Sequence, residues 1–277
     1  MDYMDLISKT LEETDKLLKP QETVWFNITK EPVGLYDSKI GGIPYFPKNM
    51  EYPTNKNGEP LILLAQLNFN NIPQIKNFPS TGILQFYIEP GDSYGFFSEN
   101  GFKVIYHKDI IQDREQLAIY DYKAKKFDMP FKEAYKLTVN KKTEMVVDIY
   151  TEKFDDIFVE KFNEHLKDLD ENEKELFNEI RSYNDLDDDT IEDLCQRNNR
   201  MKAHIGGYPL FTQYDPRDNK HNTIDYTILL FELDSIYNKD SNIDIMWGDC
   251  GIGNFFIKED DLKNLDFSNV LYNWDCY

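Results

Sequence analysis

Cysteine is scarce in this sequence. The three cysteines, Cys195, Cys250 and Cys276, lie far apart and none belongs to a CxxC pair. The sequence therefore gives no support for a four-thiolate zinc site or a thioredoxin-type dithiol. The odd number also argues against a disulfide scaffold and favours the reduced thiols of a cytosolic protein.

Long apolar runs are missing as well. No stretch approaches the roughly 20 apolar residues that a membrane-spanning helix needs. The first 18 residues carry acidic side chains where an export signal would have a basic flank and then an apolar run. We therefore expect a cytoplasmic protein with no membrane association.

Basic residues are in a clear minority, with 31 Lys and Arg against 51 Asp and Glu, for a net charge of −20. Such a chain lacks the basic face that nucleic acids and anionic membranes attract. The acidic excess is explained either by a solvated surface or by long-range attraction of a basic protein partner. The apolar content of 40% is enough for a folded domain, and we expect residues 1–277 to form one.

The hydrophobic spacing predicts an α+β fold. A helix is expected over residues 3–18, stopped by Pro20. The acidic run at 187–189 is expected to be a loop or the start of a helix. The other predicted elements are strands at 61–67, 82–89, 102–107, 118–122, 145–150, 226–233, 244–247 and 251–257, and helices from Phe154 to Leu169, from Leu176 to Tyr183 and over 259–265.

An internal repeat is the strongest feature of the sequence. Three blocks recur in the same order with offsets of 165, 166 and 169 residues, and the first shares five of its seven positions. Collinear blocks at a nearly constant offset indicate a duplicated unit. The paired blocks are 40–46 with 205–211, 63–67 with 229–233, and 82–88 with 251–257.

The expected architecture is an internally duplicated, β-rich core with pseudo-twofold symmetry, an N-terminal helix and a helical insertion. The first half spans about 20–110, the insertion about 111–200 and the second half about 201–277. Each half begins with a glycine pair that permits positive φ or a close approach of another backbone. The expected turn residues are Gly41, Gly42, Pro44, Gly206, Gly207 and Pro209.

The order of the motifs IGGxPxFP, LAQLN, GILQFYIE, HIGGYPLF, WGDCGIGNFFI and NWDC resembles the YwqG family of bacterial cytoplasmic proteins, which carry the DUF1963 domain. The resemblance covers roughly residues 20–277. It implies a duplicated α+β fold and no established activity. Members resemble proteins found near polymorphic toxin and immunity genes, which implies an immunity-like, partner-binding role. The second copy departs from the pattern because Thr212 stands where the first has Pro47.

The sharpest enzyme motif is the GxSxG around Ser93. A nucleophile elbow needs a helix after the serine, whereas a turn and a strand are expected here, which favours a hairpin turn. A working serine would need a following acid and then His204 or His221. The histidines have no metal-ligand spacing, and no phosphate-binding loop is present. We therefore expect no catalytic set, no metal and no cofactor.

Two groups of residues remain as candidates for binding. Gln66 and Gln85 are polar residues within apolar strands, so they belong either to a buried hydrogen-bond network or to a cleft between the halves. A site in that cleft would also use Glu232, Asp249 and His204. Tryptophans flanked by aspartates form either a turn or an interface; these are Trp247, Asp249, Trp274 and Asp275. The first function hypothesis is a non-catalytic protein that binds a basic toxin or another protein. The alternatives are an enzyme or small-ligand protein with an inter-half cleft, and a structural subunit.

Overall fold

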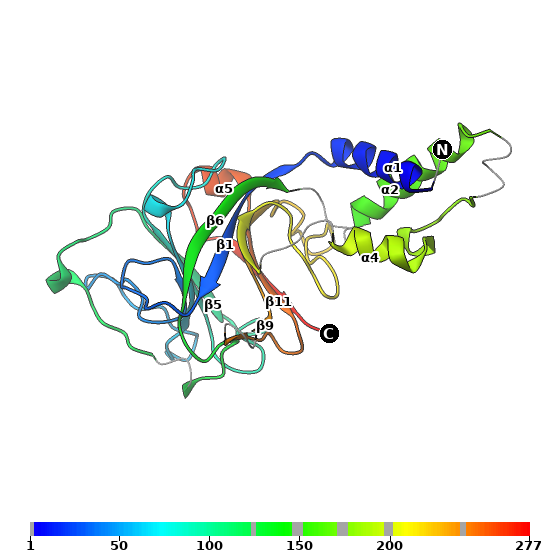
Figure 1. Ribbon diagram of the computed structural model, residues 1–277. Coiled ribbons are helices and arrows are strands. Elements are labelled where there is room, and N and C mark those ends of the chain that lie inside the picture. The colour runs from blue at the N-terminus through cyan, green and yellow to red at the C-terminus, as the bar shows by residue number, and fades with distance from the viewer. Residues whose placement is uncertain (1–2, 123–125, 146–151, 171–176, 197–201, 239–241) are drawn as a thin grey trace. The chain divides into compact units, whose positions relative to one another are not determined.

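A computed structural model describes residues 3–122, 126–145, 152–170, 177–196, 202–238 and 242–277, which form a mixed α+β fold (Figure 1). The chain divides into two compact units. We call residues 1–22 with 144–200 the helical unit, and residues 23–143 with 201–277 the sheet unit.

The helical unit contains α1 (Tyr3–Leu18), α2 (Glu152–Lys167), the short 3-10 helix η4 (Tyr183–Asp185) and α4 (Asp188–Gln196). Phenylalanines spaced four residues apart lie on the buried face of α2, with neighbouring ring centroids 5.4 Å and 6.2 Å apart. The buried ring of His165 lies 3.3 Å from a carboxylate oxygen of Glu13, which links α2 to α1.

The acidic run at 187–189 starts α4, which is one of the two alternatives that the sequence left open. The Asp187 carboxylate accepts hydrogen bonds from the backbone N–H of Thr190 at 3.0 Å and from its hydroxyl at 2.8 Å. This is the arrangement of a helix N-cap, and the acidic residues that follow in the first turn suit the helix dipole.

The sheet unit is built on a ten-stranded sheet in the order β12-β11-β8-β7-β1-β6-β2-β3-β4-β5 (Figure 1). Each strand pair in it whose register is described is antiparallel. The strands are β1 (Gln21–Thr29), β2 (Lys39–Ile40), β3 (Ile62–Asn68), β4 (Ile83–Ile88), β5 (Phe102–His107), β6 (Tyr135–Met145), β7 (Ala203–Gly206), β8 (Ile228–Asp234), β11 (Ile252–Ile257) and β12 (Val270–Asp275). A separate hairpin joins β9 (Ile236–Asn238) to β10 (Ile243–Ile245), and α5 spans Glu259–Lys263; two 3-10 turns, η1 (Phe69–Asn71) and η2 (Arg114–Gln116), complete the elements.

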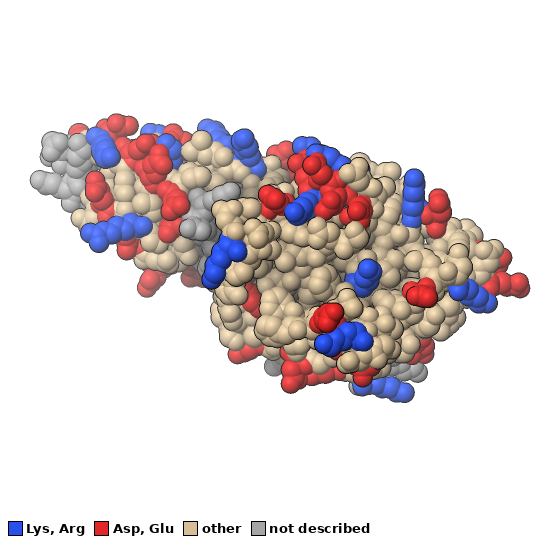
Figure 2. All heavy atoms as spheres, turned by 180° about the vertical axis from the view of Figure 1, so that it is seen from behind, with Lys and Arg blue, Asp and Glu red and all other residues tan. Residues whose placement is uncertain are grey.

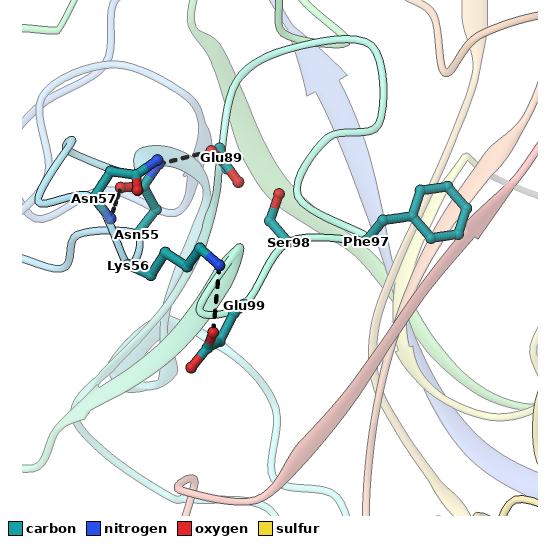
Figure 3. Close-up of a pocket in the computed structure, with 7 residues that line it drawn as sticks. All are labelled: Asn55, Lys56, Asn57, Glu89, Phe97, Ser98 and Glu99. Atoms are coloured by element: carbon teal, nitrogen blue, oxygen red, sulfur yellow. Dashed lines mark hydrogen bonds and ion pairs between the residues drawn. The ribbon is translucent and has the colours of Figure 1, made fainter.

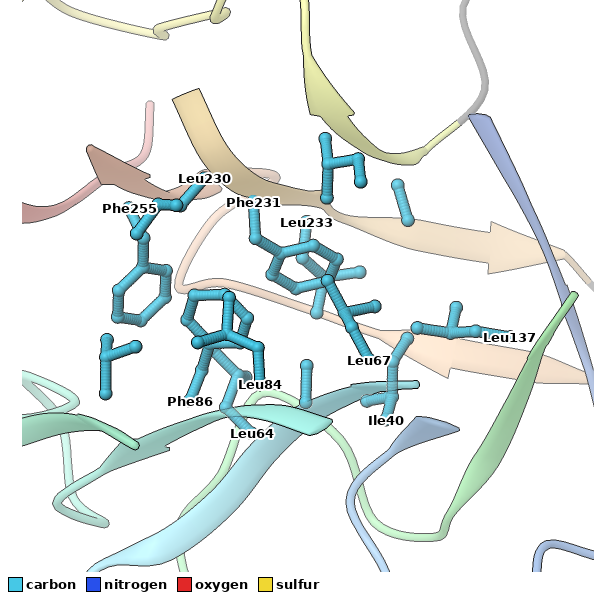
Figure 4. Packing of buried hydrophobic residues seen from close by; sticks show 14 of the residues in the cluster. Ile40, Leu64, Leu67, Leu84, Phe86, Leu137, Leu230, Phe231, Leu233 and Phe255 are labelled. Atoms are coloured by element: carbon cyan, nitrogen blue, oxygen red, sulfur yellow. The ribbon is translucent and has the colours of Figure 1, made fainter. Parts of the chain in front are cut away.

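The sheet curls around one apolar core. The ring of Phe86 on β4 stacks against Phe231 of β8 at 5.2 Å and packs on Phe255 of β11 at 4.9 Å (Figure 4). The two outermost strands also approach each other, because the rings of Phe102 on β5 and Tyr272 on β12 are 5.2 Å apart. We call β2, β3, β4 and β5 the first sheet half, and β7, β8, β11 and β12 the second sheet half.

Some predicted elements are wrong. Residues 118–122 form no strand; the chain makes only an isolated bridge there, between Leu117 and Pro47, and the Tyr120 ring packs on Tyr52 at 4.2 Å. Residues 177–180 are not helical, and 171–176 lie outside the described residues. The expected strand at 145–150 also falls outside them except for Met145, which ends β6. The strands β1 and most of β6 were not predicted.

Candidate functional site

The first sheet half carries a buried polar network on the face opposite the core. Gln66 and Gln85 are directly paired across β3 and β4, and both are fully buried. Gln66 Oε1 accepts from the backbone N–H of Tyr45 at 2.9 Å and from Gln85 Nε2 at 2.8 Å. Its Nε2 donates to the carbonyls of Leu35 and Asp37 at 2.9 Å and 2.8 Å. All four hydrogen-bonding positions of this amide are therefore used.

Gln85 is equally engaged. Its Nε2 also donates to the Tyr45 carbonyl at 2.7 Å, so the two glutamines hold both polar groups of one peptide residue. Its Oε1 accepts from the Tyr87 hydroxyl at 3.0 Å and from His107 Nε2 at 2.8 Å. Because an amide oxygen only accepts, His107 carries a proton on Nε2. Burial lowers the pKa of His107 to about 4, which keeps the ring neutral at pH 7.

Lys39 completes the network and was not predicted. It pairs with Gln66 across β2 and β3, and its side chain is fully buried. Its Nζ donates to the carbonyls of Gly34 at 2.8 Å, Leu35 at 3.2 Å and Ile43 at 2.6 Å. Desolvation lowers the pKa of the Lys39 ammonium to about 7, and the negative charge of Asp37 opposes this shift.

The second sheet half repeats this arrangement with other residues. Glu232 on β8 pairs with His204 of β7 and with Asn254 of β11. A carboxylate oxygen of Glu232 accepts from the backbone N–H of Leu210 at 2.7 Å. Asn254 Nδ2 donates to the carbonyl of the same residue at 2.8 Å. Leu210 is thus held at both its polar groups, as Tyr45 is in the first sheet half.

His204 occupies the place that Lys39 has in the first half. Its Nε2 lies 3.3 Å from the Tyr208 carbonyl and must donate to it, since a carbonyl only accepts. Its Nδ1 lies 3.6 Å from a carboxylate oxygen of Glu232, and its ring packs on Trp25 with centroids 4.6 Å apart. Both histidine and carboxylate are buried. The predicted polar candidates therefore form two separate arrays, each beneath its own loop.

The glycine pairs that open these loops have positive φ, at +62° and +77° for Gly41 and Gly42, and +65° and +70° for Gly206 and Gly207. A side chain is disfavoured in this region of backbone conformation. At Gly41 a Cβ would also lie 2.5 Å from the Phe131 ring.

Replacing Gly41 with alanine should lower the free energy of unfolding by about 2–4 kcal/mol, because backbone strain and the contact with Phe131 add. Gly58→Ala is the matched control, since Gly58 has φ +80° but a Cβ there meets nothing within 4 Å. The control should cost only about 1 kcal/mol. Urea unfolding measures both, and equal losses would contradict the steric part of the argument.

The predicted tryptophan cluster is mostly internal. Trp247 is fully buried, and a Cβ at Gly253 would lie 2.4 Å from its ring. Trp274 is half-buried, and its Nε1 donates to the Ser93 carbonyl at 2.7 Å. The Tyr94 ring packs against both indoles, at 5.3 Å and 5.0 Å. These rings tie the β4–β5 connection to the second sheet half.

Ser93 lies in consecutive turns that connect β4 directly to β5. The backbones of Gly95 and Gly101 approach each other closely there, because a Cβ at Gly95 would lie 2.0 Å from the Gly101 carbonyl oxygen. No helix follows the serine before β5, so the local geometry is that of a hairpin connection and not of a nucleophile elbow.

The two aspartates of the cluster differ in their surroundings. Asp249 is exposed in a tight turn closed by a 2.8 Å bond from the Gly251 N–H to the Trp247 carbonyl. The Asp275 carboxylate accepts from the backbone N–H groups of Thr212 and Gln213, the latter at 2.9 Å. The corresponding residue of the first half is Pro47, which has no backbone N–H group. Thr212 does have one, and the Asp275 carboxylate accepts its hydrogen bond.

A pocket of about 260 Å³ opens in the first sheet half, away from the predicted residues (Figure 3). Asn55 is buried at its edge and donates from Nδ2 to the carboxylates of Glu59 and Glu89 at 2.8 Å and 2.7 Å. Lys56 lies 3.6 Å from Glu99 across the opening. The lining is polar apart from Phe97, and it is exposed apart from Asn55 and the half-buried Glu89. The residues that line it are Asn55, Lys56, Asn57, Glu89, Phe97, Ser98 and Glu99.

Sequence reasoning missed Lys39, His107 and Asn254. Asn254 interrupts the apolar run GIGNFFI just as Gln85 interrupts GILQFYI, so the aligned repeat itself contained the signal. Lys39 and His204 both stand directly before the Ile-Gly-Gly motif, and the alignment pairs them. His107 ends a strand and offers no comparable signal.

Within the described ranges, no three His, Cys, Asp or Glu side chains come together as a metal site would require. Among the same residues, no helix has both the length and the apolar character needed to cross a bilayer.

The sequence of residues 38–276 matches the family model described as a domain of unknown function, DUF1963. Because the match covers most of the 277 residues, the chain belongs to the DUF1963 family. No curated protein matches the chain.

Proposed function

We propose that this chain is a non-catalytic, cytoplasmic, immunity-like binding protein whose helical unit captures a basic protein partner, such as a toxin. The uneven distribution of charge is the observation that supports this function. The helical unit has 25 Asp and Glu against 10 Lys and Arg, a net charge of −15, whereas the sheet unit has 26 against 21, a net charge of −5. Charge concentrated in the smaller unit creates a field that attracts a basic protein.

The acidic side chains of the helical unit are accessible to a partner. Figure 2 shows one face, on which acidic groups lie in several places on the surface, with basic groups among them. The buried face of α2 is apolar, whereas Asp156 and Glu160 on α2 and Asp189 and Asp193 on α4 are exposed. Among the residues that the structure describes, none of these four carboxylates caps a helix or holds a loop, and Glu160 alone has a nearby cation, Lys161 at 3.8 Å, so they are suited to intermolecular contacts.

We infer further that the sheet unit arose by duplication. The strand order reads the same from either edge, with β5-β4-β3-β2-β6 matching β12-β11-β8-β7-β1. The hydrogen bonds to Tyr45 in the first sheet half and to Leu210 in the second correspond donor for donor, at the offsets found in the sequence. A duplicated interior, in which buried side chains hold the loops of both sheet halves, serves as a scaffold and leaves the acidic helices as the surface for recognition.

The alternative is an enzyme or small-ligand protein with a site between the sheet halves. The side chains that would form that site, chiefly Gln66, Gln85 and Glu232, are buried and hold backbone groups of the loops above them. Their engagement supports the scaffold role, and we therefore favour partner binding.

Affinity capture from a lysate of the host tests the proposal. The tagged full-length chain should retain a basic protein in stoichiometric amount at low salt and lose it at high salt, because screening weakens contacts between exposed charges. If nothing stoichiometric is retained under either condition, or the retained protein is acidic, the proposal is wrong.

Neutralising four exposed carboxylates of the helical unit should weaken capture at low salt at least tenfold, because each contributes to the attraction and to the contacts. The variant is Asp156→Asn, Glu160→Gln, Asp189→Asn and Asp193→Asn. A control neutralises four exposed carboxylates of the sheet unit, namely Glu51→Gln, Asp92→Asn, Glu115→Gln and Asp244→Asn. Quantitative mass spectrometry compares the yields, and an equal loss in both variants would show that only net charge matters.

A further inference from the structure

The two sheet halves differ in the hydrogen bonds that one buried side-chain amide oxygen accepts. In the first half, Gln85 Oε1 accepts from the Tyr87 hydroxyl and from His107 Nε2. The strand pairing places Ile83 opposite His107, and Ile252 opposite Asp275. The second-half counterparts of Gln85, Tyr87 and His107 are therefore Asn254, Phe256 and Asp275.

Neither counterpart can donate to the Asn254 amide. Phe256 has no hydroxyl group, and the Asp275 carboxylate accepts from the N–H groups of Thr212 and Gln213. Asn254 Oδ1 is buried and accepts no hydrogen bond from any residue that the structure describes. A buried amide oxygen in this state calls for a donor from elsewhere.

One buried amide nitrogen and one buried hydroxyl of the second sheet half also have no described hydrogen-bond partner. Asn273 is directly opposite Asn254 on β12, is 4% exposed, and its Nδ2 donates to no described residue. The buried Thr212 hydroxyl, likewise without a described partner, belongs to the loop that Asn254 and Asp275 hold in place. Acceptor and donor are thus cross-strand neighbours on β11 and β12, and the hydroxyl belongs to the loop that Asn254 holds at Leu210.

Size points to the kind of molecule that would satisfy them. Asparagine is one methylene shorter than glutamine, so the Asn254 amide ends about 1.5 Å short of where the Gln85 amide reaches. Phe256 also lacks the hydroxyl of Tyr87. Compared with the first half, the second half therefore has one methylene and one oxygen fewer at this place. A group of that size that both donates and accepts is one water molecule, which in protein interiors makes about three hydrogen bonds.

We propose that the second sheet half binds a single neutral molecule of the size of water, which donates to Asn254 Oδ1 and accepts from Asn273 Nδ2 beneath the 210–212 loop. It takes the place that the Tyr87 hydroxyl has in the first half and connects β11 and β12 to the loop. The inference rests on the correspondence between the halves and is independent of partner binding.

A crystal structure of the full chain at about 1.5 Å resolution tests the site. The expected result is a density peak within about 2.7–3.2 Å of both Asn254 Oδ1 and Asn273 Nδ2. A direct hydrogen bond between the two amides, with no peak between them, would overturn the proposal.

A double variant tests it independently. Asn254→Gln with Phe256→Tyr rebuilds the first-half arrangement, so the peak should disappear and the new hydroxyl should bond to the new amide. Phe256→Tyr alone is the control, because the shorter Asn254 amide remains and the peak should stay. A peak that persists in the double variant at full occupancy would contradict the correspondence on which the proposal depends.

Discussion

Replacing Gln66 with leucine should lower the free energy of unfolding of the sheet unit by about 3–5 kcal/mol. The substitution removes the acceptor of the Tyr45 N–H and the donor to the Leu35 and Asp37 carbonyls, all within a buried region. Each buried polar group left without a partner costs about 1–3 kcal/mol. Relaxation and water entry offset part of that sum, which places the net effect at the upper end for single substitutions.

Urea unfolding followed by tryptophan fluorescence measures this change in the correct unit, since all three tryptophans, at positions 25, 247 and 274, lie in the sheet unit. The correspondence between the halves supplies the control. Glu232→Gln retains an acceptor for the Leu210 N–H and should cost about 1 kcal/mol or less, whereas Glu232→Leu should resemble Gln66→Leu. A loss below about 1 kcal/mol for Gln66→Leu would show that the network is not structural.

Lys39 should make the stability of the sheet unit depend on pH in the alkaline range. Its pKa is lowered to about 7 by burial, whereas an unfolded lysine has a pKa of about 10.4. Between these values the unfolded chain binds the extra proton, so stability rises with pH. Below about pH 7 the folded protein must keep a buried ammonium, and the desolvation cost is present in full.

Relative to Lys39→Met, the wild-type protein should gain about 3–5 kcal/mol between about pH 6 and about pH 10.5, since each unit of pKa difference is worth about 1.4 kcal/mol and the carbonyl contacts reduce the total. Urea titrations of both proteins across this pH range measure the difference between their free energies of unfolding. The contributions of the other titrating groups are the same in both proteins and cancel in that difference. A difference that stays constant within about 0.5 kcal/mol would mean that the carbonyls of Gly34, Leu35 and Ile43 hold the pKa of Lys39 near its ordinary value.

Sequence patterns predicted helices and strands correctly where a clear apolar period occurs together with proline or glycine at an element boundary. The helix at 3–18 and the strands around 62–68, 83–88, 228–234 and 252–257 were all predicted. Pro20 follows the helix at 3–18, and Gly82 precedes the strand at 83–88. The glycines of the Ile-Gly-Gly motifs are equally specific, because the structure gives them positive φ.

The errors have physical causes as well. Tyr120 and Tyr122 have high strand propensity, but they pack on Tyr52 in place of joining a ladder, so tertiary contacts override the local signal. β1 and β6 were missed because both are rich in polar residues, which obscure the apolar alternation of a strand. They lie between the two sheet halves in the strand order, a position that no local pattern encodes.

The candidate residues show the same limit. That Gln66, Gln85 and Glu232 are polar within apolar strands predicted burial and a choice between a network and a cleft. Whether these side chains form a network or line a cleft depends on which groups cover them. The covering groups come from loops distant in sequence, such as Tyr45 for Gln85 and Leu210 for Glu232. Trp247 likewise could not be assigned to the interior until the glycine at 253 was seen to receive its ring.

Hydrogen–deuterium exchange of the captured complex tests the central claim most directly. If the helical unit binds the partner, amides in residues 3–18 and 152–196 should exchange more slowly in the complex than in the free chain. The sheet unit should show little change, because its buried side chains hold its own loops and take no part in recognition. Protection confined to residues 23–143 and 202–277 would contradict the account and place recognition on the sheet unit.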